Sequence, residues 1–118
     1  MFRRKGMQYE RLAEIWLEDS GLRRLSRNFT CRLGELDLVM LEGATLVFVE
    51  VRYRASSAFG TPEDTVTRAK QQRVVRAAQF FLQRYPWHAR RDCRFDVVAI
   101  TGDADKPVVR WIKGAFSA

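Results

Sequence analysis

Two neighbouring apolar segments, each containing acidic side chains, constrain the fold of this chain more than any other feature. They are Gly34-Glu35-Leu36-Asp37-Leu38-Val39 and Val47-Phe48-Val49-Glu50-Val51-Arg52, with Gly43 between them. Their Val, Leu and Phe content is typical of β-strands, and a glycine between two strands is typical of a hairpin. A carboxylate among buried neighbours loses its solvation, so it needs compensation from a metal ion, a base or a function. The two segments therefore predict a β-hairpin that carries a divalent-cation site.

The turn decides whether the two acids meet, because side chains alternate between the faces of a strand. With an even loop centred on Gly43-Ala44, Asp37 lies directly opposite Glu50, and Glu35 lies opposite Arg52. Directly opposed side chains have Cβ atoms roughly 4.5–5.5 Å apart, close enough to share one metal ion. An odd loop would place Asp37 and Glu50 on opposite faces. Gly43 as the first residue of a two-residue type II′ turn favours the even case.

The remaining segments complete an α-β-β-β-α-β-β order. We expect helices over residues 6–19 and 61–85, further strands over 22–29, 95–101 and 108–112, and a loop over 55–60. Gly21 is placed to end the first helix, and Thr61 and Pro62 are placed to begin the second. A strand–helix–strand crossover makes the third and fourth strands parallel. The order predicts one α/β domain over residues 1–118, a central mixed sheet flanked by helices.

Charge and composition narrow the class of protein. The net charge is +7, with 21 Lys and Arg residues against 14 Asp and Glu, which favours a polyanionic partner such as nucleic acid. No apolar run is long enough to span a membrane, and no apolar core follows the basic Met1–Lys5 segment, so we expect a cytoplasmic protein. Two isolated cysteines and one histidine argue against structural zinc and against a disulfide framework.

Basic side chains gather after the hairpin and on the second predicted helix. The candidates for nucleic-acid contact are Arg54, Arg68, Arg73 and Arg76. The alternative is a solvated helix face, and the sequence leaves both open. Two further acids are expected to be structural: Asp96 bonded to backbone or to an arginine, and Glu35 as the partner of an arginine.

The spacing Asp37-x12-Glu50-Val51-Arg52, within this order of elements, resembles the restriction-endonuclease-like PD-(D/E)xK fold, with its αβββαβ core. The closer resemblance is to the bacterial YraN-like family of nuclease-like proteins, related to Holliday-junction resolvases. It extends over nearly the whole chain. The matching segments are Gly34–Val39, Leu46–Arg54, Phe59-Gly60, Lys70–Arg73, Phe95–Ile100 and Ala115-Phe116.

The resemblance implies a site and its chemistry. Asp37 and Glu50 correspond to the metal-binding carboxylates of the nuclease motif, and Glu10 resembles the helix-borne acid of related resolvases, so Mg²⁺ or Mn²⁺ is the expected cofactor. The last motif position is normally Lys and is Arg52 here, and Tyr9 stands where a Gly usually precedes the helix acid. Arginine stabilises a phosphate but does not accept a proton, since its pKa is above about 12. Lys70 is therefore a second candidate for the catalytic lysine.

Three functions stay open. The first is a metal-dependent endonuclease that hydrolyses phosphodiesters in DNA, with branched or flapped DNA as the expected substrate and a homodimer as the expected assembly. RNA is not excluded as the substrate. The second is a nucleic-acid-binding protein on a nuclease scaffold that has lost catalysis, which Arg52 favours. The third is a module that binds an acidic protein through its basic helix.

Overall fold

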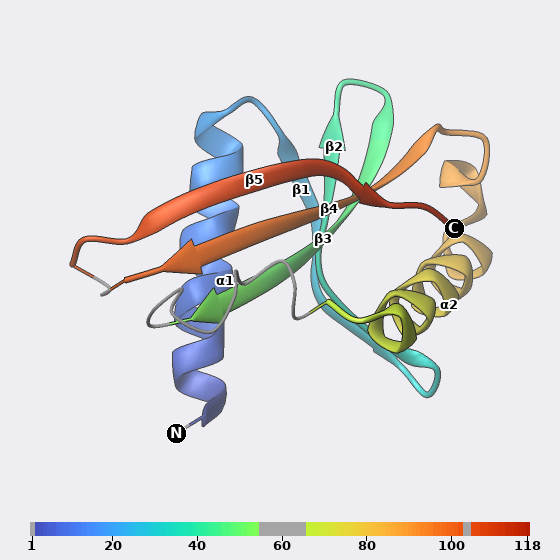
Figure 1. Cartoon of the computed structure of the whole chain (residues 1–118). Coiled ribbons are helices and arrows are strands. Elements are labelled where there is room, and N and C mark those ends of the chain that lie inside the picture. The colour runs from blue at the N-terminus through green and yellow to red at the C-terminus, as the bar shows by residue number, and fades with distance from the viewer. Residues whose placement is uncertain (1, 55–65, 103–104) are drawn as a thin grey trace.

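One mixed β-sheet organises the chain (Figure 1). The computed structural model describes residues 2–54, 66–102 and 105–118, with side chains from Gln8 onward. The elements are α1 (Phe2–Asp19), β1 (Arg23–Cys31), β2 (Gly34–Glu42), β3 (Thr45–Arg54), α2 (Arg68–Arg84), a short 3-10 helix η2 (Pro86–His88), β4 (Cys93–Thr101) and β5 (Val108–Phe116). The strands pair in the order β1-β2-β3-β4-β5. Only β3 and β4 are parallel, as the predicted crossover requires. This α/β architecture is compatible with a restriction-endonuclease-like core.

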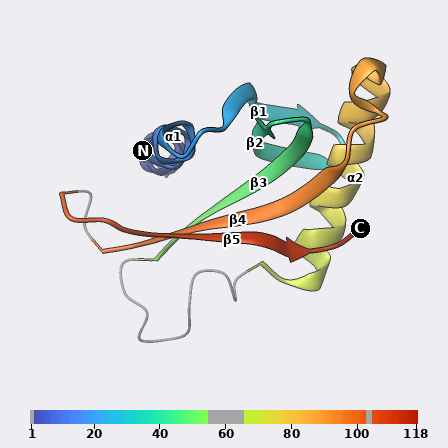
Figure 2. The ribbon, with the colours of Figure 1, turned by 90° about the horizontal axis from the view of Figure 1, so that it is seen from above.

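The two helices cover different faces of the sheet. Ala13 and Leu17 of α1 pack in one buried cluster with Leu38, Met40, Val47 and Val49. The α2 side chains Val74, Ala77 and Phe81 pack in a second cluster with Val39, Leu41, Leu46 and Phe48. Neighbouring residues of β2 and β3 thus alternate between the two clusters, as side chains on a strand must. Figure 2 shows the helices well apart, α1 near one end of the strands and α2 near the other.

Glycine ends α1 as the sequence predicts. Gly21 has a φ of 102°, and the amides of Gly21 and Leu22 donate to the carbonyls of Glu18 and Leu17, respectively. These two bonds form a Schellman motif, which needs a left-handed residue at this position. Among the described residues, no helix combines the length and apolar character needed to cross a membrane.

The β2–β3 hairpin has the predicted register. Glu42 pairs with Thr45, so the loop is Gly43-Ala44, and Gly43 has a φ of 60°. Ala44 is not among the residues with positive φ, which leaves a type II′ turn. The pairs continue to Leu38 opposite Val49. The next two residues in this register are Asp37 and Glu50, as expected from the even loop.

Strands β2 and β3 separate beyond Leu38 and Val49. The β2–β3 ladder ends at Leu38 and Val49, and in both views β3 runs toward α1 while β1 and β2 bend toward α2 (Figures 1 and 2). Because the β2–β3 pairs end at Leu38 and Val49, the expected pairing of Glu35 with Arg52 is wrong, and Glu35 pairs only on its β1 side, with Thr30. We call the divergence of β2 and β3 after Leu38 and Val49 the fork. Asp37 and Glu50 lie at its base.

The backbone of β1 is irregular at the level of the fork. Asn28 has a φ of 51°, and the β1–β2 ladder skips the position where Asn28 would face Asp37. Leu36 then packs in the α2 cluster together with Val39, although strict alternation would put these two residues on opposite faces. The predicted alternation along β2 therefore holds from Leu38 to Leu41 and fails before it.

Several helices and strands begin or end at residues other than those predicted. Thr67, with an extended backbone and a side chain that accepts from the Lys70 amide, caps α2, so the helix begins at Arg68 and Val66 lies outside it. The start expected at Thr61 and Pro62, and the loop over 55–60, lie outside the described residues. The helix α1 begins earlier than predicted, at Phe2. The strands β1, β4 and β5 each extend past the predicted range, because pairing with their neighbours continues to Cys31, Cys93 and Phe116.

Candidate active site

Asp37 and Glu50 form the centre of a buried carboxylate cluster. The Asp37 side chain is buried, with 6% of its surface exposed, and Glu50 is buried with 2% exposed. The Val51 amide donates to Asp37 Oδ2 at 2.9 Å. At the fork this amide no longer has a β2 carbonyl opposite it, and the carboxylate replaces that partner. Glu50 is contacted from α2, where Lys70 Nζ lies 3.3 Å from Glu50 Oε1.

Glu10 joins the cluster from α1. Its carboxyl lies beside that of Asp37 and beside the Asn28 side chain, and both affect its pKa. Two oxygens of the cluster, Glu10 Oε1 and Glu50 Oε2, are buried and have no hydrogen-bond partner. A buried carboxylate oxygen without a partner is rare, because the lost solvation is not replaced. The structure thus brings together Glu10, Asp37, Glu50 and Lys70 from four different elements.

Burial raises the pKa of all three acids, and repulsion from neighbouring carboxylates adds to the rise. Burial is the largest cause for Glu50, followed by the Asp37 charge, and together they raise the Glu50 pKa to about 8 despite Lys70. Burial, then Asp37 and Glu35, raise the pKa of Glu10 to about 7. Burial also raises the pKa of Asp37, while the Val51 amide bond and the Lys70 charge oppose the rise. Acids that share a site in this way each disfavour ionisation of the others.

The donors are suited to a hard cation. Carboxylate oxygens are the ligands that Mg²⁺ and Mn²⁺ prefer, and two of the oxygens present are unpartnered. In the part of the chain that the structure describes, no three Asp, Glu, His or Cys side chains are already gathered as a complete ligand set. The acids instead lie as linked contacts, Glu10 with Asp37 and Glu50 with Lys70. Asp37 and Glu50 would hold such a cation, whose positive charge would favour their ionised forms despite burial.

Arg52 and Tyr9, the two departures from the nuclease motif, both lie beside the carboxylate cluster. Arg52 is half-buried. Its positive charge lowers the pKa of both Asp37 and Glu50, so it lies near the cluster. Tyr9 is buried, and its ring stacks on Tyr53 of β3 with centroids 3.8 Å apart. This stacking ties α1 to β3 and so fixes the position of Glu10, the next residue along the helix.

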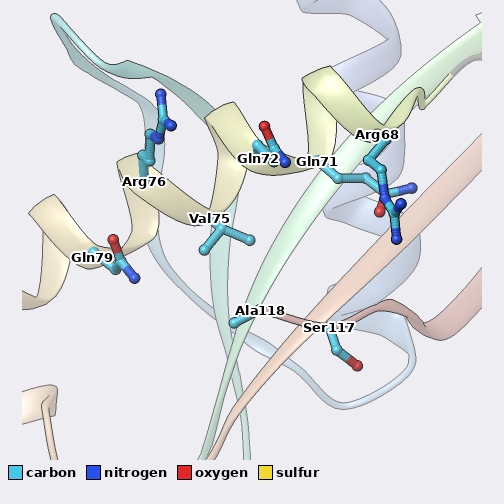
Figure 3. A pocket seen from close by; sticks show the side chains of 8 residues that line it. All are labelled: Arg68, Gln71, Gln72, Val75, Arg76, Gln79, Ser117 and Ala118. Carbon is cyan, nitrogen blue, oxygen red and sulfur yellow. The ribbon is translucent and has the colours of Figure 1, made fainter.

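The basic side chains predicted to contact nucleic acid lie on separate surfaces. Lys70 and Arg73 line a hollow with Glu35 and the β1–β2 turn. Arg68 and Arg76 line another, between α2 and the C-terminal residues Ser117 and Ala118, where glutamine amides separate them (Figure 3). Arg54 is exposed at the end of β3. The four arginines are all exposed, but they do not form one continuous surface with Lys70.

Sequence analysis missed two groups beside the site. Asn28 contacts Glu10 from β1, and its only sequence signal is a poor strand former in a predicted strand. Glu14 is buried among Arg11, Arg24 and Arg27. Its signal was the spacing of four residues from Glu10, which places both acids on one helix face. Asp96 has the predicted structural role: it accepts from Arg94, the Trp111 indole and the Gly114 amide.

Comparison with known proteins places the chain in a family. Residues 9–100 match the model of the uncharacterised protein family UPF0102. A UPF0102 protein of Stutzerimonas stutzeri is 52% identical over 113 residues, which cover 96% of this chain and 94% of that protein. UPF0102 proteins of Nitrosococcus oceani and Aeromonas hydrophila are 47% and 46% identical, covering 97% and 95% of this chain and 92% and 84% of their own lengths. The chain belongs to UPF0102, the YraN-like family that its motifs resemble.

Proposed function

We propose that this protein is a divalent-metal-dependent endonuclease that hydrolyses phosphodiester bonds in DNA at the Glu10, Asp37 and Glu50 cluster. The observation that carries the proposal is the pair of buried, unpartnered oxygens on Glu10 and Glu50, beside a third buried acid. A structural role leaves no reason for them, since neighbouring arginines satisfy the other buried acids, Glu14 and Asp96.

Glu10, Asp37 and Glu50 would hold Mg²⁺ or Mn²⁺. When bound, the cation supplies Lewis-acid polarisation of the phosphodiester and acidifies a water molecule. The Val51 amide holds the Asp37 carboxylate in place through Oδ2. Glu50 presents its unpartnered Oε2 while Oε1 holds Lys70. Asp37 and Glu50 thus each have one oxygen held by the protein, and the unpartnered oxygens of Glu10 and Glu50 are left for the ion.

Lys70 takes the place that the missing strand lysine leaves. Its ammonium group lies 3.3 Å from Glu50 Oε1, within reach of a water molecule or phosphate oxygen bound at the same carboxylate. Arg52 complements it, because a guanidinium stabilises phosphate charge bidentately but does not accept a proton. In this assignment Lys70 orients the nucleophile and Arg52 stabilises the charge that builds on the phosphate.

The test is cleavage of labelled linear, flapped and four-way DNA, and of an RNA duplex, with Mn²⁺. We expect the wild type to cut, with flapped or four-way DNA preferred, and Asp37→Asn and Lys70→Ala to lower the rate by at least 100-fold. Glu35→Gln, an exposed acid on the same strand, is the matched control and should retain most activity. Mn²⁺ binding measured by calorimetry should be lost with Asp37→Asn and retained with Lys70→Ala.

The outcomes separate the remaining functions. Binding of DNA without any Mn²⁺-dependent cutting would contradict the proposal and favour a binding protein that has lost catalysis, as Arg52 suggests. Cutting that Asp37→Asn does not affect would indicate a contaminating nuclease. Because the described residues of one chain offer one carboxylate cluster, cleavage of both strands of a junction calls for a homodimer, which light scattering with and without DNA would reveal.

A further inference from the structure

A buried glutamate gathers three arginines next to the proposed active site. Glu14 has only 1% of its side chain exposed. Arg27 of β1 donates to both of its oxygens, from Nε at 2.5 Å and from a terminal nitrogen at 2.9 Å. Arg11 donates from α1 at 2.5 Å, and Arg24 Nε lies 3.6 Å away. We call Arg11, Arg24 and Arg27 the arginine group.

The arginine group carries more positive charge than its structural role needs. Arg27 alone forms a bidentate pair with Glu14 that ties β1 to α1 and satisfies both carboxylate oxygens. Two further guanidinium groups on the same carboxylate leave a local charge of about +2. Their side chains are 53% exposed for Arg11, 39% for Arg24 and 43% for Arg27. Glu14 thus holds the guanidinium groups in place, while part of each side chain is open to solvent.

Two of the three arginines share a hollow with Glu10 of the proposed catalytic cluster. Glu10, Arg11, Glu14, Arg27, Asn28 and Leu38 line one pocket. Glu10 and Glu14 are one helical turn apart, so the guanidinium groups lie one turn from a proposed metal ligand. Lys70 and Arg73 of α2 line a different hollow. The carboxylate cluster therefore has fixed positive charge on both the α1 side and the α2 side.

We propose that the arginine group is a phosphate-binding subsite that holds the nucleic-acid backbone beside the scissile position. The proposal rests on the proposed function, since it assigns the ligand from the carboxylate cluster in the same hollow. Guanidinium groups suit phosphates because of their planar, multi-donor geometry. The backbone of the substrate then passes from the arginine group, across Asp37 and Glu50, toward Lys70 and Arg73. An acidic protein segment is the competing ligand, and competition by polyglutamate against unlabelled DNA distinguishes the two.

The experiment measures binding without cleavage. The affinity of the full chain for a fluorescein-labelled DNA duplex is determined in EDTA over a range of salt concentrations. Each phosphate contact contributes about 0.9 to the slope of log affinity against log salt. We expect Arg11→Gln and Arg24→Gln each to reduce the slope by about one, and the double variant by about two. Glu14 keeps its bidentate partner Arg27 in these variants, so both should fold.

Arg23→Gln is the matched control, because Arg23 is the exposed neighbour of Arg24 on the same strand and points to the other face. It removes the same charge and should change the slope by less than half as much. Equal changes for Arg23→Gln and Arg24→Gln would overturn the subsite. If Arg24→Gln lowers the melting temperature, Arg24→Lys decides: it should restore most of the affinity, and failure to do so would overturn the proposal.

Two further outcomes remain distinct. Competition by polyglutamate as strong as competition by unlabelled DNA would overturn the assignment to nucleic acid. Absence of Mn²⁺-dependent cleavage would contradict the proposed function, but a slope change confined to Arg11 and Arg24 would still support a phosphate subsite, because the binding assay contains no metal.

Discussion

Four buried acids illustrate how the surroundings of one side chain separate a structural role from a functional one. Among the described residues these are Glu14, Asp37, Glu50 and Asp96. Arginines and other donors satisfy both oxygens of Glu14 and of Asp96. Asp37 accepts from the Val51 amide and Glu50 lies against Lys70, but Glu50 Oε2 has no hydrogen-bond partner at all. Burial without full compensation is what marks the second pair as a candidate site.

The raised pKa of Glu50 predicts an unusual pH dependence of stability. Glu50 has a pKa of about 8 in the folded chain against an ordinary value of 4.5, so the folded state binds more protons than the unfolded state between these values. Stability then falls as pH rises from 5 to 8, by on the order of 1 kcal/mol per pH unit for such a group. Urea unfolding of the metal-free protein at several pH values measures this fall.

Glu50→Gln supplies the control for that measurement. The variant removes the titration of Glu50, so it should be less dependent on pH above 6.5 than the wild type. His88, whose pKa burial lowers, acts with the opposite sign at lower pH in both proteins and cancels in the comparison. Saturating Mn²⁺ should also flatten the wild-type profile, because a cation replaces the proton. Identical profiles for wild type and variant would mean that Glu50 is ionised throughout.

At the scale of elements, close packing of α2 on the β1–β2 turn determines where Lys70 lies. A Cβ built on Gly34 would lie 2.9 Å from the Arg73 carbonyl oxygen, so any side chain there must move the helix backbone or the turn. Lys70 is one turn before Arg73 on the same helix. The glycine thus permits the approach that brings the ammonium group to Glu50.

We therefore expect Gly34→Ala to lower stability by about 1–3 kcal/mol and to lower the cleavage rate beyond the effect of unfolding. Gly114→Ala is the comparison: its φ of 60° makes the substitution strained, but a Cβ there meets nothing within 4 Å. That variant should lose a similar amount of stability, about 1–2 kcal/mol, and keep its activity at low temperature. Thermal melting and single-turnover cleavage measure the two effects separately. Unchanged cleavage in folded Gly34→Ala would show that α2 does not need this contact to position Lys70.

At the scale of the molecule, Asp96 stabilises the β5 edge of the sheet. It connects β4 to β5 through the Trp111 indole and the Gly114 amide, and Arg94 extends the network to Glu42 and Lys113. Asp96→Asn removes the charge from a buried network, which should lower the free energy of unfolding by about 3 kcal/mol. Because Asp96 makes no contact with the carboxylate cluster, cleavage well below the melting temperature should persist. Loss of Mn²⁺ binding in this variant would indicate that the edge of the sheet also supports the site.

The sequence predicts best where local rules govern the structure. The Gly43 turn was sufficient to set the β2–β3 register as far as Leu38 and Val49, and Gly21 was sufficient to end α1. The start of α2 follows the local cap at Thr67 rather than the expected cap at Thr61, whereas the fork depends on tertiary contacts. Period-two alternation cannot anticipate the reversal at Asn28, which changes the face that Leu36 presents. Likewise, the charges of Arg11, Arg24 and Arg27 were visible, but their common partner Glu14 was not.

The bond from the Val51 amide to Asp37 offers a spectroscopic consequence. A backbone proton that a carboxylate accepts has a chemical shift sensitive to the charge of that carboxylate, whereas most amides of the sheet face neutral carbonyls. The Val51 amide resonance should therefore move when Asp37 loses a proton or gains a cation. One peak in a ¹⁵N-correlated NMR spectrum would thus report occupancy of the proposed metal site directly, without substrate and without turnover.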